Sequence, residues 1–308
     1  MKTVVSMLMA YLLLAVGLPV VLSGLVIFAR WPFAIPLLCL MALAITGIGY
    51  SFFSTPWSVY SYWSLVPLVG AGTIALAAGA FKLTRASWSW PGLIRSAASV
   101  VFLLGSAYFA SFLVAAVGAM QKPKESLALA FPLKDGVFAV VQGGAAPPLQ
   151  NKNGHASSPA QIYALDVVKL SSAGHTMPGF LQAKPGGPSA GIGVYAPCGG
   201  EVVWSRDGLP DSAERNREQP AGNVVAISCQ GVIVSLGHLE NGSVLVAEGN
   251  SVEVGELIGR VGNSASSGLH HLHFHAERGE LQGDFSDNPG VAMTFDGRFL
   301  WQGALIVK

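Results

Sequence analysis

The chain has 308 residues, of which 51% are hydrophobic and only 11% are charged. On average this composition is too apolar for an ordinary soluble enzyme. The formal net charge of +1 gives no sign of a nucleic-acid-binding protein, which would need a basic surface. The apolar excess is concentrated at the front of the chain, where no acidic residue precedes Glu125.

Four apolar segments in this front part predict transmembrane helices. They cover residues 4–29, about 33–53, about 62–81 and about 97–119, and each is about long enough to cross the roughly 30 Å of hydrocarbon in a bilayer. The first could instead be a cleaved signal peptide, but it is longer than a typical signal core and no convincing small-residue cleavage site closes it. We therefore predict an all-α membrane domain of four transmembrane helices at residues 1–121.

The loops between these segments predict the orientation of the membrane domain. Arg30 lies in the first loop and three basic residues lie in the third, whereas the second loop has no charge. Because positively charged loops stay in the cytoplasm, both ends of the domain should face outward, although basic residues at both ends weakly favour the reverse. We predict a multi-pass protein of the inner (cytoplasmic) membrane whose C-terminal domain lies on the outer, periplasmic or extracellular, side.

The character of the sequence changes from about residue 126. Glycine and proline become frequent, and short apolar runs such as "GVFAVVQ" and "GVIVSLGHL" are separated by turn residues. No long amphipathic helical pattern occurs, which indicates strands. We predict an all-β domain at residues 122–308. Its charged segment "DGLPDSAERNREQPAG" is expected to be an exposed insertion that could rim a groove.

Residues 270–275, "HHLHFH", contain four of the seven histidines of the chain. In a strand, alternate side chains share a face, so His271, His273 and His275 should point one way while Leu272 and Phe274 point into the core. Such a row of histidines is compatible with a metal site, with general acid–base catalysis or with a merely hydrogen-bonded surface.

Three other polar residues can be placed beside this row. His155 ends the loop "NKNGH", His238 follows the apolar run "GVIVSLG", and Asp166 lies within "IYALDVV". A carboxylate in such an apolar run would be costly to bury without a partner. Two histidines and one carboxylate make a tetrahedral zinc site with one open position, which is typical of catalytic zinc.

These residues resemble the lysostaphin/LytM-type zinc metallopeptidases, which cut peptide cross-links of bacterial peptidoglycan. Four blocks carry the resemblance in the order of the family: "NGHASSPAQIYALD", "VYAPCGGEVVW", "SLGHLENGSVLVAEGNSVEVGELIGRVGNS" and "HLHF". The resemblance implies a zinc (Zn2+) site made by His155, Asp166 and His273, with His238 and His271 as the catalytic histidines. It also implies a lysostaphin-type all-β fold for about residues 126–308.

The sequence departs from the family in one spacing. Ten residues separate His155 from Asp166, where most of the family has three, and this longer spacing resembles that of a membrane-anchored subgroup. His175 is a rival first ligand, but it follows the aspartate. The resemblance gives no role to His270 or His275: positions on the surface or in contact with a metal ligand are expected for both, and His275 could also line the cleft.

The resemblance implies a membrane-anchored, zinc-dependent endopeptidase that hydrolyses peptidoglycan peptides. The alternative is a non-enzymatic relative that serves as a scaffold or activator of other cell-wall hydrolases, but a substitution at a ligand position, its expected signature, is absent. A biotinyl or lipoyl carrier would need a modifiable lysine in "GNSVEVGELIGRVGN", which has none.

Cysteine pairing stays open at this level. Cys198 and Cys229 are the only cysteines of the predicted outer domain. An oxidising compartment would permit a bridge between them. Two unpaired thiols fit the sequence equally well, because it does not show the distance between their Cα atoms.

Overall fold

The computed structural model of the chain describes residue 115 and residues 118–146, 155–171, 187–212, 216–265, 269–284 and 286–308. All of these belong to the second of the two compact units of the chain. The four predicted transmembrane segments, apart from three positions at the end of the last one, lie outside the described residues, as does the rival ligand His175. Among the described residues, no helix has the length and apolarity needed to span a bilayer.

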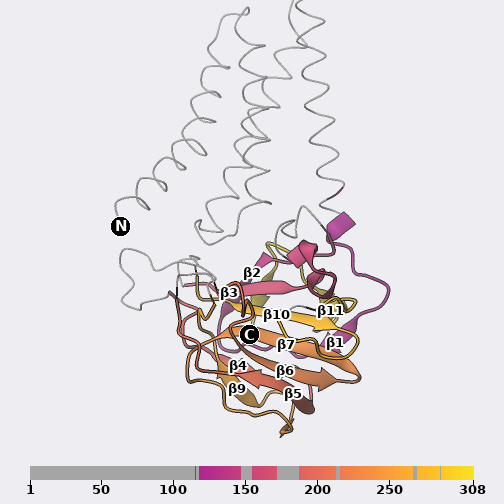
Figure 1. The fold of residues 1–308 in the computed structure, drawn as a ribbon. Coiled ribbons are helices and arrows are strands. Elements are labelled where there is room, and N and C mark those ends of the chain that lie inside the picture. Colours follow the sequence, from indigo (N-terminus) through magenta and orange to yellow (C-terminus); the bar gives the residue numbers. More distant parts are fainter. Residues whose placement is uncertain are drawn as a thin grey trace, which may run out of the picture. The chain divides into compact units, whose positions relative to one another are not determined.

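A large antiparallel sheet forms most of the described domain (Figure 1). Its strands follow the order β13-β2-β3-β10-β7-β6-β5-β8, so β10 lies in the middle, between β3 and β7. Along β10, apolar and polar residues alternate in the sequence LHFHAE, which gives this strand two different faces. The strands are β2 (Val137–Gln142), β3 (Leu165–Lys169), β5 (Gly200–Arg206), β6 (Asn223–Cys229), β7 (Val232–Leu239), β8 (Ser251–Val252), β10 (Leu272–Glu277) and β13 (Leu305–Val307).

Two smaller sheets and two short 3-10 helices complete the described elements. The three-stranded sheet has the order β1-β11-β12, and β4 pairs with β9. The prediction of an all-β domain is therefore confirmed for the described part of the chain. The bounds are β1 (Leu127–Leu129), β11 (Met293–Phe295), β12 (Arg298–Phe299), β4 (Gly193–Tyr195), β9 (Leu257–Arg260), η4 (His155–Ser157) and η5 (Pro159–Gln161).

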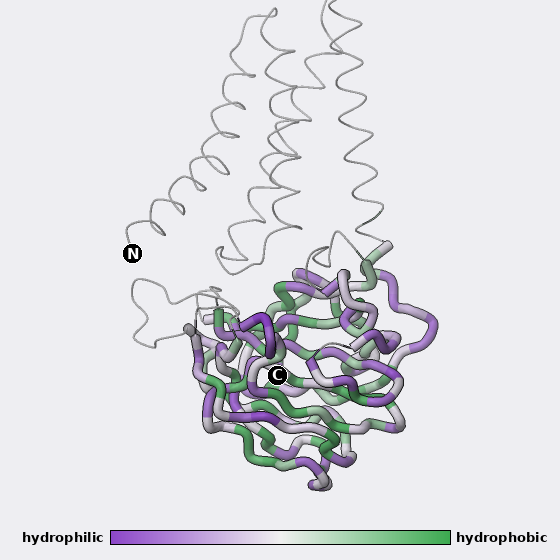
Figure 2. The backbone as a smooth tube through the Cα atoms, in the orientation of Figure 1, coloured by the Kyte–Doolittle hydropathy of each residue, from purple (hydrophilic) through white to green (hydrophobic). Residues whose placement is uncertain are grey.

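The hydrophobic core lies on one face of β10. Leu272 and Phe274 are completely or almost completely buried, and the ring of Phe274 packs edge-on against Phe295 of the small sheet, with centroids 5.6 Å apart. Phe131 extends this cluster to Phe295 and Phe138. Hydrophobic stretches run along the strands and hydrophilic ones gather in the loops (Figure 2). The core therefore anchors β10 by the side chains that alternate with its histidines.

A disulfide joins Cys198 to Cys229, with Cα atoms 6.0 Å apart. Cys198 precedes β5 and Cys229 ends β6, so the bridge ties off a segment in which the two cysteines are 31 positions apart. The sequence left open whether the two cysteines are bridged or unpaired, and the structure shows the bridge.

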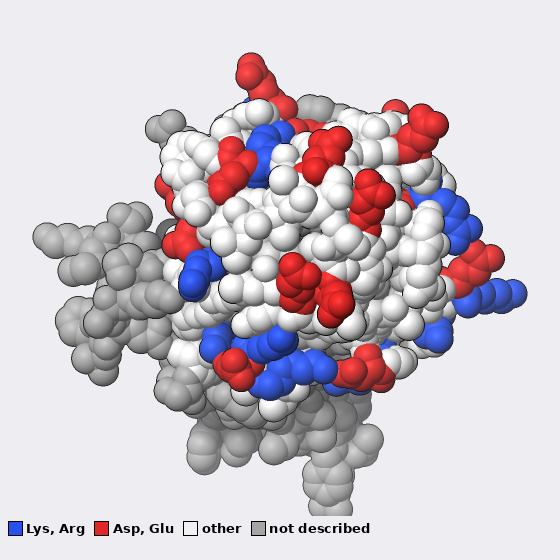
Figure 3. Space-filling model, turned by 90° about the horizontal axis from the view of Figure 1, so that it is seen from below, with Lys and Arg blue, Asp and Glu red and all other residues white. Residues whose placement is uncertain are grey.

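The described part of the charged segment "DGLPDSAERNREQPAG", residues 207–222, lies against two loops of the domain. Asp207 accepts hydrogen bonds from the backbone amides of Gly242 and Val244. Asp211 accepts one from Asn263 at 2.5 Å and another from the amide of residue 241. On the face drawn in Figure 3, acidic and basic side chains are interspersed. The carboxylates of Asp207 and Asp211 thus hold the described part of this segment against the neighbouring loops.

Candidate metal and catalytic site

Asp166 and His273 lie directly opposite each other on adjacent strands. β3 pairs with β10 in antiparallel register, and the two residues are Cα partners. Directly opposite residues point to the same face of a sheet, with side chains in contact. Nδ1 of His273 lies 2.9 Å from Oδ1 of Asp166, and both residues are buried. The pairing of the two strands is therefore what brings these two side chains together.

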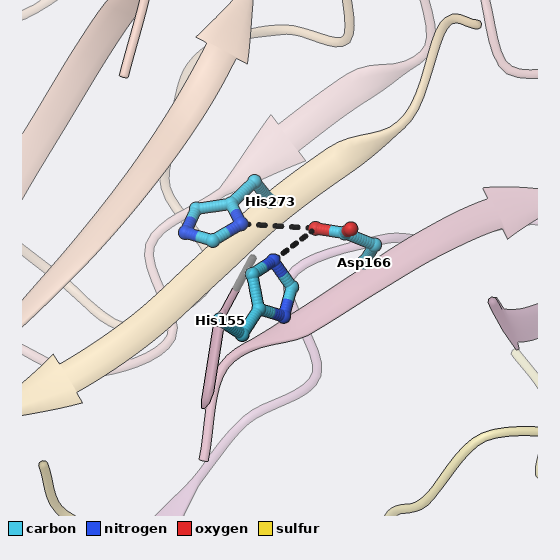
Figure 4. Close-up of side chains that lie close together, drawn as sticks. All are labelled: His155, Asp166 and His273. Carbon is cyan, nitrogen blue, oxygen red and sulfur yellow. Dashed lines mark hydrogen bonds and ion pairs between the residues drawn. The ribbon is translucent and has the colours of Figure 1, made fainter. Parts of the chain in front are cut away.

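His155 reaches the same carboxylate oxygen from η4. Its Nε2 lies 3.3 Å from Oδ1 of Asp166, and the three side chains point toward one another (Figure 4). One ligand atom from each of His155, Asp166 and His273 lies within 4.8 Å of the others. A tetrahedral zinc ion with bonds of about 2.0–2.2 Å separates its ligand atoms by about 3.4 Å. The donor set of two imidazoles and one carboxylate is one that zinc takes, and the separations of 2.9 and 3.3 Å from the carboxylate oxygen are close to that spacing.

The charge of Asp166 is stabilised by the histidines around it. Burial alone would raise the pKa of this carboxyl group, but the positive forms of His155 and His271 and their hydrogen bonds outweigh burial and hold the pKa well below its usual value. The sequence predicted that Asp166 would need a partner, and the structure supplies three histidines. An ionised carboxylate is the form that binds a metal cation.

His271 also faces the carboxylate. Its Nε2 lies 3.3 Å from Oδ1 of Asp166, and its Nδ1 donates to the carbonyl oxygen of Leu269 at 3.0 Å. Burial lowers the pKa of His271, but the charge and hydrogen bond of Asp166 and the bond to Leu269 raise it by more, so that the net shift is upward. The structure places His271 as near to Asp166 as His155 is.

His238 completes the group from the end of β7. Its ring centroid lies 4.9 Å from that of His271 and 5.8 Å from that of His273. Its Nδ1 lies 2.8 Å from the carbonyl oxygen of Ser264. Burial, followed by the positive forms of His271 and His273, lowers its pKa to about 3. His238 is therefore held neutral, whereas the pKa of His271 is shifted upward.

The backbone around His238 explains how the ring reaches this position. His238 has a φ of 59°, a left-handed conformation that is uncommon for residues other than glycine and frequent at functional sites. Its amide donates to the carbonyl oxygen of Ala221 at 2.9 Å. Gly237, directly opposite His273, must lack a side chain, because a Cβ there would lie 2.8 Å from the same oxygen.

His275 is one of the two histidines to which the resemblance gave no role. It is buried, and its Nδ1 lies 3.2 Å from Nε2 of His273. Burial, followed by the positive forms of His273 and His155, lowers its pKa well below the usual value. A surface position for His275 is therefore wrong, because its ring is buried against His273, which is predicted to be a ligand. His270 is only partly buried and precedes β10.

Two charged residues that the sequence did not single out hold the loop beside His238. Arg206 forms a two-pronged ion pair with Asp284, with distances of 2.5 and 2.9 Å, and also donates to the carbonyl oxygen of Gly222. Asp284 in turn accepts from the amide of Ala221 at 2.9 Å. No sequence signal could have paired two charges that stand 78 positions apart.

The fold and the site define a class: an all-β domain with three side chains that could hold a metal ion, His155, Asp166 and His273, and two further histidines beside them. Residues 185–285 match the family model described as Peptidase family M23. The matched range includes His238, His271 and His273, and it begins after His155 and Asp166. The predicted resemblance is confirmed for this part of the chain.

Several solved structures resemble the chain. The catalytic domain of the antimicrobial peptidase lysostaphin from Staphylococcus simulans is 22% identical, with a TM-score of 0.25, and the similarity covers 33% of this chain and 66% of that one. A variant of the catalytic domain of the prophage-encoded M23 protein EnpA from Enterococcus faecalis is 18% identical, with a TM-score of 0.31 and coverage of 49% and 88%.

A zinc-containing peptidase from Vibrio cholerae is 19% identical, with a TM-score of 0.32, and the similarity covers 54% of this chain. The chain spans only 39% of the length of the Vibrio protein. A search of curated proteins found no match.

Proposed function

We propose that the chain is a membrane-anchored, zinc-dependent endopeptidase that hydrolyses peptide cross-links of bacterial peptidoglycan. The observation that carries this proposal is the convergence of His155, Asp166 and His273. Nδ1 of His273 and Nε2 of His155 lie 2.9 and 3.3 Å from the same oxygen atom of Asp166. The match of residues 185–285 to peptidase family M23 supports it.

The three converging residues would hold the zinc ion, and the next two would act on the substrate. Zinc, when bound, would polarise the scissile carbonyl group and lower the pKa of a water molecule to around 7. The donor set leaves one position of a tetrahedron open, as in catalytic zinc sites.

His238 is suited to act as the general base. A carbonyl oxygen only accepts hydrogen bonds, so Nδ1 of His238 carries the proton that bonds to Ser264. Nε2 is then unprotonated, and the lowered pKa of His238 keeps the ring neutral. A neutral imidazole with a free Nε2 can hold the attacking water and take its proton.

His271 is suited to the opposite role. Its Nδ1 also donates to a carbonyl oxygen, while its Nε2 faces the carboxylate of Asp166. Burial lowers the pKa of His271, but the charge and hydrogen bond of Asp166 raise it by more, which favours the protonated ring. With the Asp166 oxygen bound to zinc, Nε2–H of a protonated His271 could donate instead to the negative charge that develops on the scissile carbonyl oxygen. Two neighbouring groups whose pKa values are pushed apart are typical of an acid and base pair.

The proposed location is the outer side of the cytoplasmic membrane, where the peptidoglycan substrate lies. The charge difference between the predicted loops supports this orientation. The Cys198–Cys229 bridge also supports it, because disulfides persist in oxidising compartments.

The activity can be tested on the full-length protein, purified in detergent and incubated with purified peptidoglycan. We expect the release of peptide fragments cut at one kind of cross-link, which mass spectrometry would identify, and complete loss of release with a zinc chelator. Release should return when zinc is added back. A protein that holds zinc but leaves peptidoglycan intact would be the non-enzymatic relative, and the endopeptidase proposal would fail.

A further inference from the structure

We propose that His275 is a positioning residue, which holds the ring of His273 in the one tautomer and orientation that can bind the metal. This inference rests on the proposed zinc site. It starts from the contact between Nδ1 of His275 and Nε2 of His273, which are 3.2 Å apart in a buried environment. The two ring centroids are 5.3 Å apart.

The tautomer follows from the two neighbours of His273. Nδ1 of His273 is the nitrogen that faces Asp166, and a nitrogen that binds a metal must be unprotonated. The single proton of the neutral ring then lies on Nε2, where it needs an acceptor because the ring is buried. Nδ1 of His275 is in the place of that acceptor.

His275 accepts a hydrogen bond that other chemical groups accept in most metal sites. A ligating histidine usually donates its second N–H to a carboxylate, a backbone carbonyl or water. Here the partner is a second imidazole, which accepts through Nδ1 while its own proton lies on Nε2. His275 can therefore accept from His273 without adding a second negative charge to the site.

The strand gives His275 the rigidity that this role needs. β10 is bonded on both sides, to β3 and to β7, and His275 is the Cα partner of Ser235 on β7. On the opposite face of β10, Phe274 and Ala276 are almost completely buried. The sheet and the core therefore fix the orientation of the His275 side chain, and His275 and His273 lie on the same strand.

Two variants at this position separate the hydrogen bond from the bulk of the ring. His275→Phe keeps a planar ring but cannot accept a hydrogen bond, whereas His275→Gln keeps an acceptor oxygen. His270→Phe is the matched control, because it makes the same replacement outside the row of alternating histidines. The zinc affinity of each full-length protein in detergent would be measured by competition with a chromogenic chelator, with circular dichroism as the check on folding.

We expect His275→Phe to bind zinc about 10–100-fold more weakly than the wild type. His275→Gln should recover most of the affinity, and His270→Phe should leave it unchanged. Equal zinc affinity of folded His275→Phe and the wild type would overturn the positioning role and leave the zinc site standing. A wild-type protein that binds no zinc would overturn the proposed function itself.

A measurement on the wild type keeps the inference testable if His275→Phe does not fold. In the zinc-loaded protein with 15N-labelled histidine, NMR should find a proton on Nε2 of His273 that exchanges slowly with water. The same spectrum should show an unprotonated Nδ1 in His275. A proton on Nδ1 of His275 would contradict the inference, because His275 could not then accept from His273.

Discussion

Nδ1 of His238 donates a hydrogen bond of 2.8 Å to the carbonyl oxygen of Ser264, 26 positions further along the chain. Ser264 is itself fixed, because its hydroxyl donates to the carbonyl oxygen of Leu239 at 2.7 Å and accepts from the amide of Asn223 at 2.9 Å. The tautomer of His238 is thus imposed by a backbone atom. The proposed base is therefore ready before the substrate arrives, which lowers the cost of reorganisation during the reaction.

The proposed catalytic pair should be separable from the metal site. His238→Ala should keep zinc but lower the rate of hydrolysis by about 10²–10⁴-fold, because it removes the proton acceptor and leaves the ligands in place. Turnover on peptidoglycan and bound zinc would be measured on the same sample. A variant with wild-type turnover would exclude His238 from the mechanism.

His271→Ala should have a similar effect on hydrolysis. Its outcome is especially informative because Nε2 of His271 lies as close to Asp166 as that of His155, at 3.3 Å in both cases. Retained zinc with lost activity fits a group that acts on the substrate. Loss of zinc from a folded His271→Ala protein would instead make His271 a ligand.

Removal of a proposed ligand should remove the metal. His273→Ala leaves His155 and Asp166, which are too few protein ligands to compete with water for zinc. The wild-type protein should hold about one zinc ion per chain, and the variant almost none, as measured by atomic emission spectroscopy after dialysis. His270→Ala provides the control. Full zinc occupancy in His273→Ala would refute this ligand assignment.

The ion pair between Arg206 and Asp284 should matter for both stability and activity. Its side chains are mostly shielded from solvent, with 17% and 10% of their surfaces exposed. Breaking such a pair leaves a charge without its partner, so Arg206→Met should lower the free energy of unfolding by about 3 kcal/mol. It should also lower turnover without loss of zinc, because the loop at Ala221 that holds the backbone of His238 is released.

An exposed pair of the same domain gives the control for this effect. Lys308 and Asp296 lie 2.5 Å apart, but Asp296 is 69% exposed. Lys308→Met should change the free energy of unfolding by less than about 1 kcal/mol, since water screens surface pairs. Chemical denaturation of both variants would provide the comparison, and equal losses would show that burial of Arg206 is not what matters.

The row of histidines on β10 could be predicted from the sequence because strand periodicity is local. Alternation alone placed His271, His273 and His275 on one face and Phe274 in the core. The register between β3 and β10 could not be predicted, because it joins residues 107 positions apart, and periodicity carries no information about which strands pair. The apolar run around Asp166 predicted that this carboxylate needs a partner, but only the resemblance to a family made it a ligand together with His155 and His273.

The same limit explains what was missed around His238. The partner of its Nδ1 is a backbone carbonyl oxygen, which every residue has, so Ser264 carried no distinctive signal. The contact of His275 with His273 depends on how the two rings are turned, and alternation gives only the face. Local patterns therefore predicted which residues share a surface, while tertiary packing determined which of their atoms meet.

The disulfide should stabilise the β domain. Cys198→Ser together with Cys229→Ser should lower the free energy of unfolding by about 3 kcal/mol, since a bridge of this span restricts the unfolded chain. Thiol counting on the denatured, unreduced protein offers a direct test, because the chain has three cysteines. If Cys198 and Cys229 are bridged, only Cys39 should react, whereas three reactive thiols would rule the bridge out.

The orientation in the membrane is the prediction on which the substrate depends. The basic residues of the first and third loops place both ends of the predicted membrane domain outside, and the domain that carries His273 would then face the cell wall.

An alkaline phosphatase fused after Lys308 should therefore be active, because this enzyme needs an oxidising compartment for its own disulfides. A fluorescent reporter that matures only in the cytoplasm should be dark at the same position. Fusions after Arg30, in a loop predicted to be inside, should show the reverse pattern and so control for expression. An inactive phosphatase together with a bright cytoplasmic reporter after Lys308 would separate the site from peptidoglycan, and the proposed substrate would have to be abandoned even if the zinc site were correct.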